Sequence, residues 1–363
     1  MSVVLSNQSI EKKIEKHKAF WNKEQVQSPV VGIFLGSWTF FKDNRGGDNI
    51  WSSKKISPND IHPESFIEDY EMLFQTEESI GDDLIRAAQP FASIPWMEAI
   101  AGCEICCSKP NVWTEPIAKS VAEIPEIRFS SDNPWVCKYI EFLKIFGERF
   151  DNKHPLAASI LRGPSDVLAA LVGDEASVYA YIDCPEQTKK VLADITNLFC
   201  DFIKYQWGNT PAFYDGYILP QNEIWVSQKP VRFQEDASAL ISPSIYEEFL
   251  LPCDKEIVSL SKYNMIHLHT TSLHLLDYFL SNENVGIIQI SKDDGFEDMN
   301  RLVRSLQKIQ ARQKCLILRG VFSVEELVLI RQMVSPTGFC IHSVVKTKQQ
   351  ASEHTHILKE KWA

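Results

Sequence analysis

The stretch MIHLHTTSLHLLDYFLSNENVGIIQIS, residues 265–291, decides the expected fold. Its two ends, 265–271 and 285–291, are short apolar runs typical of buried strands, and residues 272–282 between them have the apolar spacing of a helix. A strand, a helix and a second strand in this order are typical of a parallel βαβ unit. The stretch therefore predicts a parallel sheet covered by helices.

The rest of the chain repeats this alternation in both directions. Further apolar runs predict strands, and amphipathic stretches that begin near Ser, Pro or Asp predict helices. The additional strand candidates are VVGIFLG (30–36), LIRAAQ (84–89), LAASILRG (156–163), AFYDGYI (212–218), VRFQEDA (231–237), CLILRG (315–320) and GFCIHS (338–343). The additional helix candidates are 140–150, 185–207, 243–263, 296–313 and 323–333.

The expected architecture is of the α/β class, a single (β/α)8 TIM barrel. We expect residues 1–28 to form an N-terminal helical extension, residues 29–363 to form the barrel, and residues 90–115 to make a long loop excursion over one end of it. Nine strand candidates are one more than such a barrel needs. An open doubly wound sheet is the alternative, but no GxGxxG or GxxxxGK[ST] motif follows the first strand.

Composition limits the function. The 363 residues are 44% hydrophobic and 23% charged, as in an ordinary globular protein, and no run approaches the roughly 18 apolar residues of a membrane span. The 37 basic and 48 acidic residues give a net charge of −11, which disfavours nucleic acid as a partner. Nine scattered cysteines predict reduced thiols in a cytoplasmic protein rather than a disulfide framework.

The pair His267 and His269 is the sharpest chemical signal. Side chains two residues apart in a strand lie on the same face, and a barrel carries its site at the carboxyl ends of its strands. Two imidazoles in this arrangement can bind one metal ion, and zinc, nickel or iron would suit them. The alternative is that either histidine only satisfies a buried hydrogen bond.

The strand GFCIHS offers a second pair, since Cys340 and His342 share a face by the same alternation. If that face points inward, either residue can supply a third metal ligand, and His342 is the predicted one. The alternative is that Cys340 is a small buried apolar residue and His342 belongs to a loop.

Other polar residues close the predicted strands. Asp236 can orient a histidine, act as a general acid or base, or bind a polar substrate group, and it can instead cap the following turn. Gln234 lies on the same face as Asp236, and we expect it to contact substrate. Arg162 can bind an anionic substrate or pair with a structural carboxylate. Tyr214, in AFYDGYI, is also expected to bind substrate.

The stretch SIPWMEAIAGCEICCSKPNVW, residues 93–113, is too irregular for a plain crossover. Trp96 could lie over an apolar ligand, and Cys103 could act as a thiolate nucleophile. Packing of aromatic residues and thiols within a long loop explains the same residues without a ligand.

Three ordered motifs carry a family resemblance: ILRGPSDVLAALVG, FQEDASALISPSIYEEFLLPCDKEIV and HLHTTSLHLLDYFL. With them the chain resembles the uroporphyrinogen decarboxylase superfamily from about Pro29 to the C-terminus. The resemblance implies a single (β/α)8 barrel and one of two chemistries. These are cofactor-free decarboxylation of uroporphyrinogen, and zinc-dependent methyl transfer between methylcobamide proteins and thiols or other acceptors.

The decarboxylase pattern is broken. Phe34 and Trp38 stand where the family has two substrate-clamping arginines, Ala169 matches its tyrosine, and Asp236 matches its serine. The family's late histidine falls near Val344 or Val345. A polycarboxylate substrate needs cations, and these positions supply none. True uroporphyrinogen decarboxylation is therefore disfavoured.

The methyltransferase pattern fits in part. His267 matches the histidine of its H-x-C motif, His269 replaces the first cysteine, and the second cysteine falls near Val345, where Cys340 or His342 could substitute. The resemblance implies a methyltransferase with zinc and a corrinoid protein as partner, acting on a small methyl donor or acceptor. Since members often pair, a homodimer is one expected assembly. The alternatives are a lyase for a smaller carboxylated substrate and a non-catalytic binding protein on the same barrel.

Overall fold

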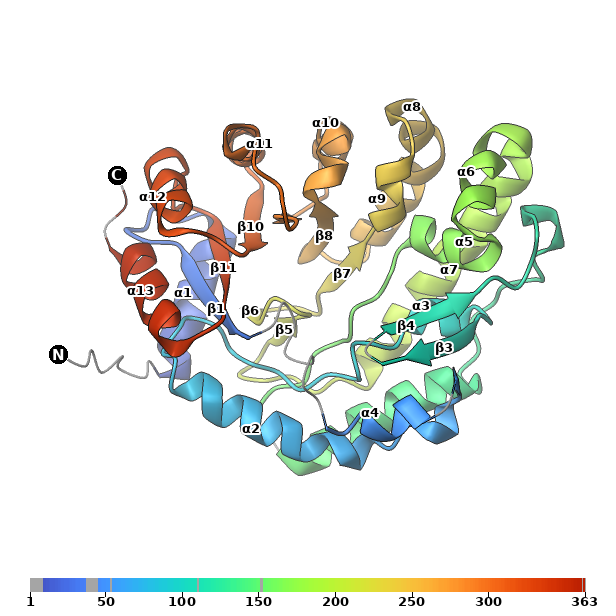
Figure 1. The fold of residues 1–363 in the computed structure, drawn as a ribbon, viewed down its shortest axis with the longest axis horizontal. Coiled ribbons are helices and arrows are strands. Elements are labelled where there is room, and N and C mark those ends of the chain that lie inside the picture. The colour runs from blue at the N-terminus through green and yellow to red at the C-terminus, as the bar shows by residue number, and fades with distance from the viewer. Residues whose placement is uncertain are drawn as a thin grey trace.

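The computed structural model describes residues 9–36, 45–52, 54–109, 111–150, 153–360 and 362. Its main sheet has six parallel strands in the order β1-β11-β10-β9-β8-β7 (Figure 1). The first strand therefore lies beside the last, an arrangement expected of a barrel and not of a doubly wound sheet. The strands are β1 (Val30–Leu35), β7 (Val231–Gln234), β8 (Asn264–His269), β9 (Ile287–Ser291), β10 (Cys315–Gly320) and β11 (Phe339–Val345).

Two predicted strands, 84–89 and 156–163, are extended segments with isolated bridges. Ala88 pairs with Leu156, and Arg162 pairs with Gln234 at the end of β7. On the side of β1, side-chain carboxylates replace part of the ladder. The N–H of Val31 donates to Asp83 Oδ2 at 2.8 Å, and the N–H of Ile33 donates to Asp82 Oδ2 at 2.9 Å. A regular strand is not assigned there because these donors bond to side chains and not to carbonyls.

The helices form a ring around the strands (Figure 1). The predicted helix over 243–263 is interrupted by a π-helical turn, Tyr246–Leu250, directly before Leu251 and Pro252. A proline inside a helix has no N–H to donate, which favours such a local widening. The helices of the ring are α2 (Ile67–Glu78), α4 (Pro134–Phe150), α5 (Pro164–Val172), α6 (Asp174–Asp183), α7 (Pro185–Gly208), α8 (Pro243–Ile245), α9 (Leu251–Ser259), α10 (Leu276–Ser281), α11 (Met299–Ala311), α12 (Val324–Met333) and α13 (Lys348–Lys359). Within the described ranges, no helix has the length and apolarity to cross a membrane.

The strands alternate between two faces. One face packs in the large core with the helices, and it carries residues such as Val31, Ile266 and Ile341. The other, which we call the inner face, begins with a separate apolar cluster at the amino ends of the strands, including Val30 and Met265. Toward the carboxyl ends the inner face becomes polar. Its buried polar residues are Arg232, Gln234, His267, Gln289, Ser291, Arg319 and His342.

The strand candidate 212–218 is the one that does not join the main sheet, since only its last two residues are in a strand, β5, which belongs to a separate two-stranded hairpin. Tyr214 and Asp215 have positive φ angles of 50° and 57° and form a tight turn before β5 (Tyr217–Leu219) and β6 (Ile224–Val226). Leu219 and Ile224 pack into the apolar cluster at the amino ends of the main strands. The hairpin therefore covers the end of the sheet opposite His269.

The predicted loop excursion over 90–115 is an ordered substructure instead. It contains α3 (Trp96–Ile100), β3 (Glu104–Ser108) and β4 (Asn111–Glu115), and β2 (Lys55–Ile56) completes a three-stranded sheet in the order β2-β3-β4. The buried run Ile105, Cys106 and Cys107 of β3 explains why the cysteines cluster there, since they pack as small apolar residues.

Both ends of the chain are tied to one buried carboxylate. Lys16, on α1 (Ile10–Asn22), lies 2.6 Å from Asp83 Oδ2, and Lys359, on α13, lies 3.1 Å from Asp83 Oδ1. Burial raises the pKa of Asp83, but these two ammonium groups outweigh it and the pKa is lowered. The expected N-terminal helical extension thus packs on the seam between β1 and residues 82–89.

The fully buried His17 of α1 gives a testable pH dependence. Its Nδ1 accepts from the N–H of Trp225 and its Nε2 donates to the carbonyl of Asp83, so the ring must be neutral. Burial lowers its pKa to about 3, whereas the unfolded chain keeps the usual value near 6.5. The stability from neutral His17 is present above pH 6.5 and is lost as the pH falls toward 3. The difference in the free energy of unfolding between the wild type and His17→Gln, measured by urea titration, should shift by about 2 kcal/mol against the wild type between pH 7 and pH 5. Parallel pH profiles of the two proteins would contradict this.

Candidate metal centre

Three side chains meet at the carboxyl ends of β7 and β8. His267 and His269 alternate onto the inner face of β8, and Asp236 follows β7 at the start of a short 3-10 turn. The two Nε2 atoms are 3.2 Å apart, and each lies 3.8 Å from Asp236 Oδ1. Among the described residues, this is the group of histidine, cysteine and acidic side chains whose ligand atoms converge closely enough to hold one metal ion.

The hydrogen bonds of the two histidines set their tautomers. His267 Nδ1 is 2.7 Å from the amide oxygen of Gln289, and His269 Nδ1 donates to Asp293 Oδ1. When both rings are neutral, these bonds put the proton of each ring on Nδ1, so that the two Nε2 atoms present lone pairs to one another. Asp236 Oδ1 is buried without a hydrogen-bond partner among the described residues. Three electron pairs facing one point repel each other unless a cation lies between them.

The spacing fits a tetrahedral ion. Ligands bound at about 2.0 Å in a tetrahedron are about 3.3 Å from one another. The observed separations of 3.2 Å and 3.8 Å lie close to this value. Two neutral imidazoles and one carboxylate form the type of set that catalytic zinc uses, with a fourth position open.

Electrostatics favour the metal-binding form of His267. Burial lowers its pKa well below 6.5, and the positive charge of Arg232 lowers it further, so that this ring stays neutral at physiological pH. Burial raises the pKa of Asp293, but hydrogen bonds from Thr270 and His269 outweigh burial and lower it, so Asp293 is an anion that orients His269.

Replacing Asp293 by asparagine tests this orienting role. Loss of the charged acceptor behind His269 should weaken zinc binding by about 10- to 100-fold while the melting temperature changes little. Competition titration with a chromogenic chelator measures the affinity. The exposed neighbour Asp294→Asn is the matched control and should bind zinc like wild type. Equal affinities of the two variants would contradict the role of Asp293.

Buried carboxyl groups surround the Asp236 side of the group. Gln234 Nε2 donates to Asp236 Oδ2 at 2.6 Å, and Asp166, in the first turn of α5, accepts from the N–H of Ala237 at 2.7 Å. Burial raises the pKa of Asp166 to about 8, and the charge of Asp236 adds to this effect. Burial also raises the pKa of Asp236, and the positive charges of His269 and Arg232 oppose this effect.

The structure does not bring His342 into this group. His342 lies on the inner face, but its Nδ1 accepts from Arg319 Nη2 at 3.2 Å, and its ring packs against Phe34. Cys340 is also inward, yet it lies in the apolar cluster near the amino ends of the strands, where burial raises the pKa of its thiol. The sequence did not identify Asp236 as a possible metal ligand. Strand alternation predicts on which face of the sheet a side chain lies, but not which side chains of other strands it approaches.

The predicted substrate residues divide into two groups. Gln234 and Arg162 lie beside the metal group, because the backbone of Arg162 pairs with that of Gln234, the last residue of β7. Arg162 Nη1 also donates to the buried Glu98 at 2.9 Å. Tyr214 does not lie there, because its turn is on the hairpin at the opposite end of the sheet.

Trp96 and Cys103 do not present reactive surfaces. Trp96 is fully buried against Trp135 and Tyr139, and its indole N–H donates to the carbonyl of Phe91. Burial raises the pKa of Cys103 to about 12, so its thiol is neutral at physiological pH. Both residues are packing residues of the ordered substructure.

Other functional residues were missed by the sequence. Strand alternation could have identified Gln289, which lies on the inner face of β9 as the histidines do on β8. Asp293 could have been identified by its position just beyond the carboxyl end of β9. Cations other than Arg162 are also present on the inner face, at positions that the sequence analysis did not single out. They are Arg86, Arg232 and Arg319, and the guanidinium carbon of Arg319 lies 4.4 Å from the centre of the Phe34 ring. Trp38, the other departure from the family pattern, is outside the described residues.

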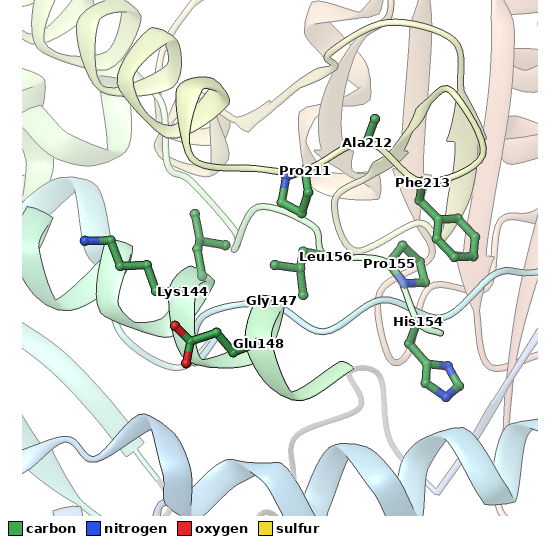
Figure 2. Close-up of a pocket in the computed structure, with 10 residues that line it drawn as sticks. Lys144, Gly147, Glu148, His154, Pro155, Leu156, Pro211, Ala212 and Phe213 are labelled. Atoms are coloured by element: carbon green, nitrogen blue, oxygen red, sulfur yellow. The ribbon is translucent and has the colours of Figure 1, made fainter. Parts of the chain in front are cut away.

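A separate pocket of about 420 Å³ opens beside α4 and the amino end of the segment 155–163. Lys144 and Glu148 line it from the helix, and Pro211, Ala212 and Phe213 line it from the segment before β5 (Figure 2). Because the metal group is at the carboxyl end of this segment, this pocket is not part of the candidate site.

No protein-family model and no curated protein sequence matches the chain. Its structure is similar to that of a methyltransferase from Methanosarcina mazei, with a TM-score of 0.67, 12% sequence identity, and coverage of 95% of this chain and 97% of that chain. At this identity the similarity shows a shared fold. The α/β class expected from the sequence is confirmed.

Proposed function

We propose that the protein is a zinc-dependent methyltransferase that moves a methyl group between a corrinoid carried by a partner protein and a thiol or another small acceptor. The convergence of His267 Nε2, His269 Nε2 and Asp236 Oδ1 carries the proposal. The fold shared with a methyltransferase and the sequence resemblance to the corrinoid-dependent branch support it.

The proposal takes the fold as a closed (β/α)8 barrel. The segments 82–89 and 155–163 would occupy the two strand positions between β1 and β7. The backbone bond from Asp83 to Val31 and the bridges Ala88–Leu156 and Arg162–Gln234 support this closure. In such a barrel the metal group lies at the end where active sites are built.

The residues of this chain would have distinct roles in this reaction. His267, His269 and Asp236 would hold zinc, which lowers the pKa of a thiol bound at its open position. Gln289 and Asp293 fix the rings with their Nε2 atoms toward that position. Gln234 Nε2 donates a 2.6 Å hydrogen bond to Asp236 Oδ2 and so orients this carboxylate. All three proposed ligands would therefore be oriented before any substrate binds.

The test is methyl transfer from free methylcobalamin to 2-mercaptoethanol, followed by the absorbance change of the corrinoid. The sulfur–methyl bond forms as the cobalt–methyl bond breaks, cob(I)alamin leaves with the electron pair, and the thiol proton goes to solvent. Zinc-loaded wild type should catalyse the transfer and His267→Ala should not. Absence of transfer by zinc-loaded protein would overturn the proposal, and release of carbon dioxide from a small carboxylic acid without corrinoid would assign a lyase instead.

A further inference from the structure

The pocket beside α4 is separate from the metal group and has no part in the reaction proposed above. Pro155 and Leu156 line it at the start of the segment 155–163. Near the other end of this segment, Arg162 pairs with Gln234 beside the metal group. The volume of the pocket, about 420 Å³, is in the range of small-molecule sites. A ligand bound there is therefore distinct from the substrate of the metal centre.

Apolar side chains form most of the lining of this pocket. Leu143, Leu156 and Phe213 contribute buried side chains. Pro211 and Ala212, just before Phe213, contribute exposed ones (Figure 2). An apolar group bound against these residues is removed from water, which favours its binding.

Aromatic packing fixes the side of the pocket that His154 lines. The imidazole ring stacks on Phe74, with ring centroids 3.8 Å apart and an angle of 5° between the two planes. Phe150 lies against the same ring in a T-shaped arrangement, with centroids 6.2 Å apart. A ring held by two aromatic neighbours keeps one orientation, so this side of the pocket needs little ordering when a ligand binds.

Gly147 opens the pocket on the side of the helix. It lies within α4, where glycine is less favourable than alanine. A Cβ added at this position would have Leu156 Cδ1 as its nearest neighbour at 3.7 Å, which is an ordinary van der Waals contact. The described neighbours therefore leave room for a side chain at Gly147, and what the glycine contributes is open space in the pocket.

Two opposite charges at the pocket are unpaired. The other charged residues of α4 form ion pairs, Lys138 with Glu141 at 2.6 Å and Arg149 with Glu71. Lys144 and Glu148 are exposed, and neither forms an ion pair or a side-chain hydrogen bond within the described part of the chain. A lysine four residues before a glutamate is the less favourable order for a pair along a helix. Both charges therefore remain available to a ligand.

We propose that this pocket binds a small apolar α-amino acid. The carboxylate of the ligand pairs with Lys144, its ammonium group pairs with Glu148, and its side chain fills the space beside Gly147. Residues four apart on a helix have Cβ atoms about 5–6 Å apart, so one compact zwitterion reaches both charged groups. An α-amino acid carries both charges on one carbon atom, with its apolar group directly beside them.

The test compares L-leucine with three smaller probes, each of which lacks one of its features. 4-Methylpentanoate lacks the ammonium group, 3-methylbutylamine lacks the carboxylate, and glycine lacks the apolar side chain. Ligand-observed NMR titration of the full-length protein gives the four dissociation constants. Each single-charge probe should bind at least about threefold more weakly than leucine, because one exposed ion pair is lost. Glycine should bind at least about tenfold more weakly, because the apolar burial is lost.

Substitutions assign each feature to its residue. Lys144→Met should bind leucine and 3-methylbutylamine equally, and Glu148→Gln should bind leucine and 4-methylpentanoate equally. Gly147→Leu should fill the pocket and abolish binding of leucine, while its melting temperature stays unchanged or rises because leucine favours helices more than glycine. The exposed Lys190→Met, on α7, is the matched control and should bind all four probes like wild type.

Three results would overturn the proposal. They are the absence of leucine binding by wild type, binding of either single-charge probe as tightly as leucine, and undiminished binding of leucine by Gly147→Leu. If Gly147→Leu does not fold, the wild-type comparison and the two charge variants decide. Because none of these measurements involves zinc or a corrinoid, failure of the proposed methyl transfer would leave this result unaffected.

Discussion

The double variant His267→Ala/His269→Ala should contain no zinc when the wild type contains close to one ion per chain. Each substitution removes a direct ligand, so each should cost more than the 10- to 100-fold in affinity that an outer partner costs. Methyl transfer should disappear with the metal. Elemental analysis of proteins purified side by side, with zinc supplied during expression, measures the effect.

Thermal unfolding distinguishes loss of the site from loss of the fold. Zinc at 1,000 times its dissociation constant should stabilise the wild type by about 4 kcal/mol and leave the double variant unchanged. Without metal, the two melting temperatures should differ by only a few degrees, because one ring is partly exposed and the variant also removes the repulsion between two lone pairs. His274→Ala is the matched control, since this exposed histidine has its hydrogen bonds within the described part of the chain to the carbonyls of Thr271 and Ile241. Zinc retained by the double variant would refute the site.

Gly163→Ala should strongly destabilise the protein. A Cβ at this position would lie 2.0 Å from Glu235 Oε1 and 2.7 Å from the carbonyl oxygen of Gln234. Neither can move freely. Glu235 is fully buried and accepts from the N–H of Ser165 at 2.8 Å, while the Gln234 carbonyl accepts from Gly163 itself. We expect a loss of about 3 kcal/mol or more in the free energy of unfolding.

The same substitution should weaken zinc binding, because Gln234 and Glu235 directly precede Asp236, the proposed third ligand. Gly208→Ala is the matched control: it is the last residue of α7 and nothing lies within 4 Å of its added Cβ. Since alanine favours helices more than glycine, this control should be neutral or slightly stabilising. Urea unfolding of both variants checks the prediction, and similar stabilities would contradict the proposed crowding at Gly163.

Strand alternation was the most informative property of the sequence. It placed His267 and His269 on one face of their strand and Cys340 and His342 on one face of theirs, and the structure has both pairs on the inner face. It could not tell which inward residues approach one another across the sheet. That depends on strand order and register, so Asp236 and not His342 completes the group.

The other differences have local causes. Tyr214 lies in an apolar and aromatic run that predicts a strand. The turn at Tyr214 and Asp215 instead reverses the chain before β5 begins. Trp96 lies in a segment rich in turn residues, which predicts a loop, whereas its ring is enclosed by aromatic side chains from α4. The roles of Gln234 and Arg162 toward substrate remain predictions.

The two ion pairs on Asp83 have a mechanical consequence. Lys16 near one end of the chain and Lys359 near the other both bind the carboxylate of Asp83. A force applied through the two termini would therefore act on Asp83 before the force reaches the central strands. In an optical-trap experiment the first rupture would release α1 and α13 together, and Asp83→Asn would lower the force of that first step while the later steps kept theirs.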